Sequence, residues 1–180
     1  MEQVPREVVW LVSFVLIEAA IIDGRSLRVP NLLTYNFLAG GLIFAFWKGG
    51  TALLLMSVAG AAVGLMTLLP LYAIGGMGAG DVKLMAGVGA WIGPWLTLWA
   101  FLSSAVVGAV MAAGMIVYSG ELYRHLAMMH TIGHEVLSIR NPAVLSERAA
   151  QRKPTMKLLP YGIPIAVGTI AFFAWTGLLT

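Results

Sequence analysis

The feature that most constrains this chain is a series of six apolar runs with few charges, separated by glycine, proline or polar residues. They cover residues 8–22, 32–47, 51–73, 82–92, 95–118 and 158–179. A helix of about 20 apolar residues crosses the hydrocarbon core of a bilayer. The chain is 59% hydrophobic and 11% charged, so it has more apolar surface than a soluble domain of 180 residues can bury. We expect an all-α integral membrane protein built as a six-transmembrane-helix bundle.

Basic residues are distributed unequally between the two ends of these helices. If the helices alternate from an outer N-terminus, one side receives only Arg6 and Lys48. The other side receives Arg25, Arg28, Lys83, Arg124, Arg140, Arg148, Arg152, Lys153 and Lys157. Because basic residues accumulate in cytoplasmic loops, we expect both termini outside and loops 23–31, 74–81 and 119–157 in the cytoplasm.

Residues 1–180 are interpreted as one polytopic membrane domain with a single long polar excursion, 119–157. The excursion begins with "ELYRHLAMMHTIGHEVLSIR", in which apolar residues recur at helical spacing. This pattern predicts a cytoplasmic amphipathic helix on the membrane surface, between helices 5 and 6 of the bundle. His125, His130 and His134 lie in this segment, but no further ligand stands at an obvious position, so we predict no metal site.

Asp23 and Asp81 are the two aspartates of the chain, and each stands where a loop meets an apolar run. Thirteen residues separate Trp10, a candidate outer anchor, from Asp23, and thirteen separate Asp81 from Pro94. Both intervals rise about 20 Å, which predicts a similar depth for the two carboxylates, below the cytoplasmic surface. For either acid alone, a helix cap or a solvated loop-edge acid is an equally good interpretation.

As a pair, the two aspartates have what water-activating acid/base chemistry needs. One carboxylate accepts a proton from water, while the other, kept neutral by its charged neighbour, polarises a carbonyl group. The preceding segment "GGMGAG", residues 75–80, does not complete a nucleotide-binding loop. It is interpreted as a flexible turn, as a bare backbone that lets an extended substrate approach Asp81, or as both.

Three segments resemble the motifs of one protein family, the type IV prepilin peptidases. "GAGDVKLMAGVGAWIG" (78–93) is similar to their G-x-G-D motif, and "DGRSLRVPNLLT" (23–34) to their first-aspartate motif. "LLPYGIPIAVG" (158–168) resembles the Pro-[FY]-Gly-x-Pro segment that opens their last helix. The resemblance implies an intramembrane aspartic endopeptidase that removes prepilin leaders at the cytoplasmic face of the bacterial inner membrane, with Asp23 and Asp81 as the catalytic pair.

The size of the chain resembles that of the small peptidases of tight-adherence (Flp-type) pili, and also of the archaeal preflagellin peptidases. Larger relatives carry a long cytoplasmic domain after the first helix, often with a cysteine tetrad, and an N-methyltransferase activity. Here the first loop is short and the chain has no cysteine, so we expect neither that zinc site nor that activity, and no cofactor. The implied partners are a prepilin, through its leader and N-terminal helix, and the lipid bilayer, but no nucleic acid. The oligomeric state is left open.

Several residues near the two acids are candidates for supporting roles. Gly78 and Gly80 belong to the glycine segment, and Pro30 with Asn31 is expected to cap and orient the second helix. Arg28 is expected to meet lipid phosphates, with the alternative that it tunes Asp23.

Lys83 and Glu18 are further candidates for supporting roles. Lys83 is two residues from Asp81, about 200° around a helix, so it is expected to point elsewhere and reach the interface, or else to position the substrate or the glycine segment. Glu18 lies inside an apolar run, where an acid is a functional hypothesis by default. It bonds a polar group on a neighbouring helix, binds a positive group of the substrate, or acts in catalysis.

Two other classes of protein remain as alternatives. A small transporter or proton channel would use Glu18, Asp23 and Asp81 as a relay, but it would also show inverted repeats and a polar path to the other face, which the sequence does not contain. An inactive assembly factor would keep the bundle without needing either aspartate.

Overall fold

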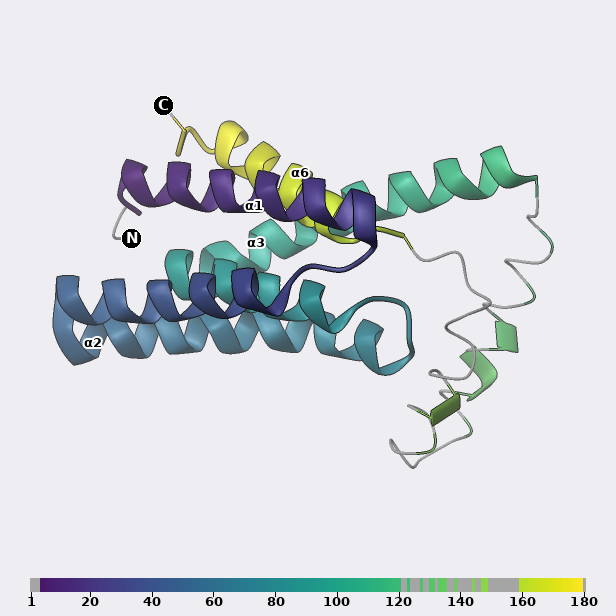
Figure 1. Ribbon diagram of the computed structural model, residues 1–180, viewed down its shortest axis with the longest axis horizontal. Helices are drawn as coiled ribbons and strands as arrows, with labels where there is room; N and C mark the ends of the chain where they lie inside the picture. Colours follow the sequence, from purple (N-terminus) through teal and green to yellow (C-terminus); the bar gives the residue numbers. More distant parts are fainter. Residues whose placement is uncertain are drawn as a thin grey trace.

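The computed structural model describes residues 4–120 and 159–179, with the single positions 123, 127, 130, 131, 133–135, 138, 144, 147 and 148 between them. The helices in these two stretches are α1 (Arg6–Ser26), α2 (Asn31–Ala73), α3 (Ala79–Ser119) and α6 (Gly162–Trp175) (Figure 1). The expected all-helical architecture is confirmed for the described residues. The amphipathic helix expected within 119–157 lies largely outside them.

Two glycine sites interrupt the long helices α2 and α3. In α2 the helical conformation fails at Gly49 and at Gly50, which has φ 60° and ψ −147°. In α3 it fails at Gly93, with φ 78° and ψ 171°, directly before Pro94. Glycine adopts such backbone angles without a steric penalty, and proline cannot continue the hydrogen-bond ladder. Each helix therefore turns back on itself and has two arms (Figure 1).

By length and composition, α2, with 43 residues, and α3, with 41, are each long and apolar enough to cross a membrane. Helix α6 is a shorter apolar helix of 14 residues. Many large apolar side chains stand on the outer surface, among them Leu32, Trp47 and Val117. An apolar exterior of this kind is typical of a protein surrounded by lipid rather than water.

The first arm of α3 is the centre of the bundle. Between residues 81 and 90, every residue except Lys83 is buried. The second arm of α2 packs closely on it, because a Cβ atom on Gly60 would lie 2.0 Å from the carbonyl oxygen of Gly89. One on Gly64 would lie 2.2 Å from the carbonyl oxygen of Met85. This glycine pair therefore lets the two helices approach closely.

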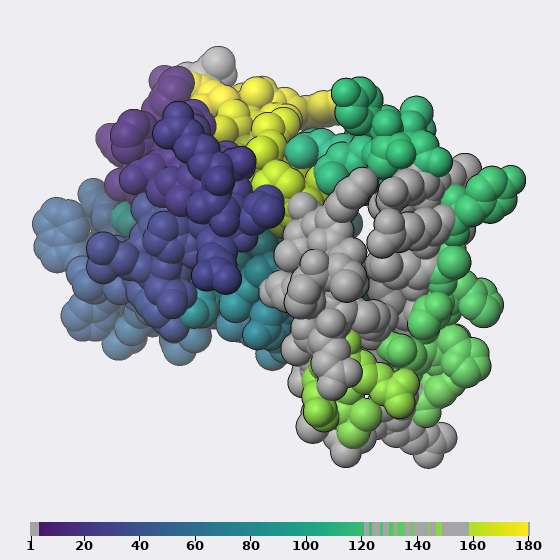
Figure 2. Space-filling model, turned by 45° about the vertical axis from the view of Figure 1, so that its right-hand side comes forward, coloured from purple at the N-terminus to yellow at the C-terminus, as the bar shows by residue number. Residues whose placement is uncertain are grey.

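Helix α6 packs against both α1 and α3, and it lies between them in the space-filling view (Figure 2). The C-terminal end of α1 and the N-terminal ends of α3 and α6 meet at one end of the bundle (Figure 1). Both acids lie inside helices there, since α1 continues to Ser26 and α3 begins at Ala79. The expected loops 23–31 and 74–81 were too long, because the charged and glycine residues that flank the apolar runs still form helical turns.

Candidate active site

Asp23 lies in the last turns of α1, and only 3% of its surface is exposed. The backbone N–H of Gly162 donates a hydrogen bond to Oδ2 of Asp23, with an N–O distance of 2.8 Å. Gly162 is the first residue of α6 and stands 139 positions further along the chain. The N-terminus of one helix therefore holds a buried carboxylate of another, which offsets part of the cost of removing that group from water.

Glycine is required at position 162 by this contact. A Cβ atom there would lie 2.9 Å from Cβ and 3.0 Å from Oδ2 of Asp23. Any side chain would push α6 away from α1 and lengthen the hydrogen bond. In the sequence, Gly162 stands out only as part of the segment that resembles a family motif. The two prolines that flank it in "PYGIP" also predict that a helix starts there.

Asp81 is the third residue of α3, and 5% of its surface is exposed. Its Oδ2 accepts a hydrogen bond from the backbone N–H of Gly78, at 3.0 Å. A carboxylate in the first turn complements the partial positive charge of the helix start, so the helix-cap interpretation is correct for Asp81. Cap and buried acid are the same side chain here, and the one role does not exclude the other.

Two bridges connect the surroundings of the two aspartates. After Asp23, the chain passes through Val29, whose carbonyl oxygen would lie 2.7 Å from a Cβ atom on Gly80. On the other side, Tyr161 directly precedes Gly162 and lies within the electrostatic influence of Asp81. The Tyr161 hydroxyl would lie 3.2 Å from a Cβ atom on Gly108, in the second arm of α3. Tyr161, which sequence reasoning missed, therefore links the start of α6 to α3.

Lys83 reaches α2. Its Nζ donates a hydrogen bond to Oδ1 of Asn31 at 2.9 Å and stands 4.6 Å from the centre of the Tyr35 ring. Asn31 is the first residue of α2, and no side chain caps that helix at Pro30. The expectation that Asn31 caps α2 is therefore wrong, because its amide oxygen is used by Lys83. The pair instead ties the start of α2 to the turn of α3 that carries Asp81.

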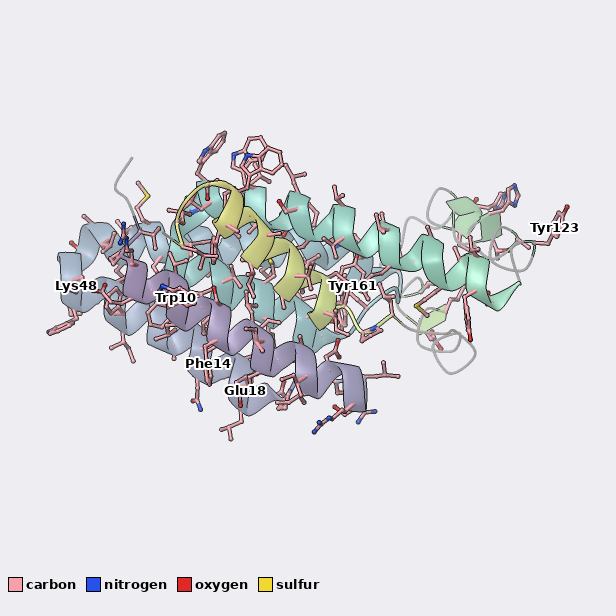
Figure 3. All side chains as sticks on the ribbon, turned by 90° about the horizontal axis from the view of Figure 1, so that it is seen from above. Trp10, Phe14, Glu18, Lys48, Tyr123 and Tyr161 are labelled. Atoms are coloured by element: carbon pink, nitrogen blue, oxygen red, sulfur yellow. The ribbon has the colours of Figure 1, made fainter. Side chains whose placement is uncertain are left out.

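Glu18, Arg28 and Pro30 are exposed and do not join the buried acids. Glu18 lies on the outer face of α1 in line with Trp10 and Phe14, which are 59% and 71% exposed (Figure 3). Five residues separate it from Asp23, which places the two side chains on different faces of the helix. Over the described part of the chain, no group of three or more acidic or histidine side chains is arranged to hold a metal ion.

Comparison with known proteins places these residues in a family. Residues 10–113 match the family model described as the type IV leader peptidase family. The chain belongs to this family. A prepilin leader peptidase/N-methyltransferase of Aeromonas hydrophila is 39% identical over 114 residues, which cover 59% of this chain and 39% of that protein. A protein of the same name from Neisseria gonorrhoeae is 36% identical over 119 residues, 62% of this chain and 40% of its own length. No solved structure matches the chain.

The extent of these matches matters for the site. The chain spans about two fifths of the length of the curated relatives that it matches. The leader peptidase family match contains both aspartates and the glycine segment, but it ends before α6. The contact between Asp23 and Gly162 therefore joins the matched region to a helix that the family model does not cover.

Proposed function

We propose that this chain is an intramembrane aspartic endopeptidase that cleaves the leader peptide of type IV, Flp-like prepilins at the cytoplasmic face of the bacterial inner membrane. The observation that carries the proposal is the pair Asp23 and Asp81. Both are buried at the same end of the bundle, each accepts an N–H bond from a glycine at a helix start, and both lie within the region that matches the leader peptidase family.

The proposed reaction uses the two carboxylates as one unit that shares a proton. The ionised member accepts a proton from a water molecule, and the hydroxide formed attacks the scissile carbonyl carbon. The protonated member donates its proton to the carbonyl oxygen, which gives a neutral tetrahedral intermediate. When the C–N bond breaks, the proton taken from water passes to the leaving amine, and one hydroxyl group of the intermediate returns its proton to the other carboxylate as the carbonyl group re-forms. Because the two carboxylates share a proton, the roles of base and acid are assigned to the pair and not to one residue each.

The glycine segment would border the bound substrate. Gly75 has φ 82°, and a Cβ atom on Gly80 would strike the backbone of Val29, so both positions favour glycine. A peptide bond must be unwound before it can be hydrolysed, and backbone that is not helical is tolerated at membrane depth only where protein or water satisfies it. Residues 75–80, with Gly78 and Gly80 next to Asp81, supply such a border.

The proposed topology is one membrane domain, residues 1–180, that crosses the bilayer six times. Helices α1 and α6 and the four arms of α2 and α3 would be the spans, with both termini outside. Lys48 lies at one end of the molecule, far along its long axis from Tyr161 (Figure 3), whereas Arg25, Arg28 and Lys83 lie near the two aspartates in the chain. The excess of basic residues near the acids supports a cytoplasmic active site.

The relay of a transporter or proton channel has no comparable support. Glu18 is exposed and faces outward on α1, whereas Asp23 and Asp81 are buried inside the bundle. A proton path needs groups that follow one another through the interior of the protein.

Co-expression tests the proposal. The chain and an Flp-like prepilin are produced together in a bacterium that lacks its own prepilin peptidases, and leader removal is followed as a decrease in the mass of the prepilin. The wild-type chain should remove the leader, and Asp23→Ala and Asp81→Ala should not. Processing that survives both single substitutions would overturn the proposal, provided that the variants reach the membrane in normal amounts.

A further inference from the structure

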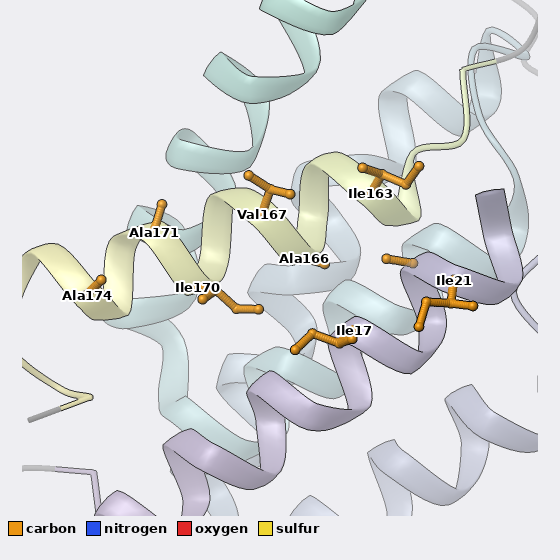
Figure 4. A pocket seen from close by; sticks show the side chains of 9 residues that line it. Ile17, Ile21, Ile163, Ala166, Val167, Ile170, Ala171 and Ala174 are labelled. Carbon is orange, nitrogen blue, oxygen red and sulfur yellow. The ribbon is translucent and has the colours of Figure 1, made fainter.

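An apolar groove runs along the surface between α1 and α6. Its volume is about 580 Å³. Ile17, Ala20 and Ile21 of α1 form one wall, and the face of α6 from Ile163 to Ala174 forms the other (Figure 4). No charged side chain lines it. The groove therefore suits an apolar occupant.

The groove begins beside Asp23. Ile21 precedes Asp23 by two residues, and Ile163 follows Gly162, which donates the hydrogen bond to Asp23. The Ile163 side chain also packs on the residue after Asp23, since its Cδ1 would lie 3.5 Å from a Cβ atom on Gly24. The inner end of the groove therefore lies at the junction of α1 and α6 where Asp23 is held, although Asp23 itself is buried beneath that junction and does not line the groove.

The length and shape of the groove fit a helix rather than a small molecule. The eleven steps of 1.5 Å from Ile163 to Ala174 give a rise of about 16 Å, which is half of a bilayer core. Ala166, in the floor, is 3% exposed, whereas Ile17, Ile21 and Val167 on the rims are each about half exposed. Small residues in a floor let a second helix approach closely, and the branched rims add contact area.

We propose that this groove holds the apolar helix that follows the leader of a prepilin, and so presents the scissile bond to Asp23. The inference rests on the proposed function, because a prepilin must place its cleavage site at the aspartates. The helix would run outward along α6, away from the cytoplasmic end. The outward-facing acid Glu18 is not among the residues that line the groove.

Cross-linking tests the position of the substrate directly, because the chain contains no cysteine. Val167→Cys, in the groove, is combined with Asp81→Ala so that the prepilin stays uncleaved. Val110→Cys is the matched control, since Val110 is also exposed but lies on α3 outside the groove. Single cysteines placed along the prepilin helix should cross-link to position 167 with a helical period, and not to position 110.

A second variant blocks the groove. Ala171, an exposed lining residue, is changed to Phe, and exposed Ala109 of α3 is changed to Phe as the control. Loss of one good apolar contact corresponds to about a tenfold loss of specificity, so Ala171→Phe should raise KM for full-length prepilin by about this factor. Its kcat should not change. A short peptide that contains only the cleavage junction should be cut equally by both variants and by the wild type.

The possible results separate the inference from the proposed function. Suppose that the wild-type chain cleaves the prepilin, that folded Ala171→Phe has an unchanged KM, and that position 167 does not cross-link to the prepilin. The groove inference is then wrong, and lipid fills the groove. If position 167 cross-links only to itself, a second copy of the chain occupies the groove, and the inference is again wrong. If the wild-type chain cleaves no prepilin, the proposed function fails first.

Discussion

Asp23 and Asp81 differ from Glu7 and Glu18 in burial and in their hydrogen-bond partners. The two glutamates are exposed, whereas each aspartate is buried and accepts a backbone N–H from a glycine. The donor to Asp81 belongs to its own helix start, but the donor to Asp23 comes from α6. The geometry of Asp23 consequently depends on how α6 is seated, whereas the Gly78 bond holds Asp81 within the start of its own helix.

Gly162→Ala should lower kcat strongly. The new Cβ atom would collide with Asp23 and displace the carboxylate, and a displacement of about 1 Å can cost about 100-fold in rate. Gly24→Ala is the control, because its Cβ atom would make only an ordinary contact of 3.5 Å with Ile163. Steady-state cleavage of a prepilin measures both. Equal rates for the two variants would show that Gly162 does not position Asp23.

Glu18→Gln should leave the cleavage rate unchanged. The side chain lies on the outer face of α1, with Trp10 and Phe14, and not with Asp23 (Figure 3). The measurement is kcat/KM for full-length prepilin. A loss of tenfold or more, about 1.4 kcal/mol, would mean that Glu18 contacts the substrate or the reacting groups.

Single-residue reasoning predicted the two acids but not their partners. Both aspartates could be found from the sequence, because an acid next to an apolar run stands out in a chain with so few charges. Gly162 and Tyr161 could not, because their contacts join residues more than 50 positions apart, and an isolated glycine or tyrosine carries no such information. The role of Asn31 was wrong for the same reason, since its partner Lys83 comes from another helix.

The helices themselves were largely predictable. Apolar runs 32–47 and 51–73 correspond to the two arms of α2, and 82–92 and 95–118 to the two arms of α3, with the reversals at Gly49, Gly50 and Gly93. Helix ends were less predictable. Polar residues occur in the sequence before a helix ends, as in the last turns of α1, which continues to Ser26. At the other end of the chain, α6 begins only after Pro160.

Close helix packing depends on glycine at two interfaces. Gly60 and Gly64 bring α2 onto α3, and Gly168 brings α6 onto α3, where a Cβ atom would lie 2.4 Å from Cα of Ser104. On the α3 side of this interface the small residues Ser104 and Gly108 receive Gly168 and Pro164 of α6. These glycines position α6, and through it the Gly162 donor.

Gly60→Ala should destabilise the bundle. The added methyl group would overlap the backbone of Gly89, and overpacking of this kind typically costs about 1–3 kcal/mol. Gly114→Ala, in the same type of helix but with nothing within 4 Å, should leave stability unchanged or raise it slightly. Unfolding in detergent with increasing denaturant measures the difference. Identical unfolding midpoints for the two variants would contradict the packing described here.

The whole molecule gathers its special features at one end. The end of α1 that carries Asp23 meets the starts of α3 and α6 there (Figure 1), and the glycine segment and the inner end of the groove belong to these same elements. The apolar runs were enough to predict an all-helical architecture, which the described residues confirm. How α6 closes against α1 and α3 could not be predicted, because it depends on contacts between the first and last parts of the chain.

Cysteine labelling tests the proposed orientation of the molecule. Lys48→Cys and Arg28→Cys both place a thiol at an exposed position of a chain that has no other cysteine. A membrane-impermeant maleimide should label position 48 in intact spheroplasts, and position 28 only in inverted vesicles. Labelling of both positions from one side would contradict the proposed topology.

The central claim is that Asp23 and Asp81 act as one catalytic unit, and a comparison of single and double variants in purified form tests it most directly. Cleavage of full-length prepilin is measured for the wild type, Asp23→Asn, Asp81→Asn and the double variant, all shown to be folded. Groups that act as a unit are not additive, so each single variant should lose as much activity as the double variant. Retention of wild-type cleavage by either single variant would contradict the account.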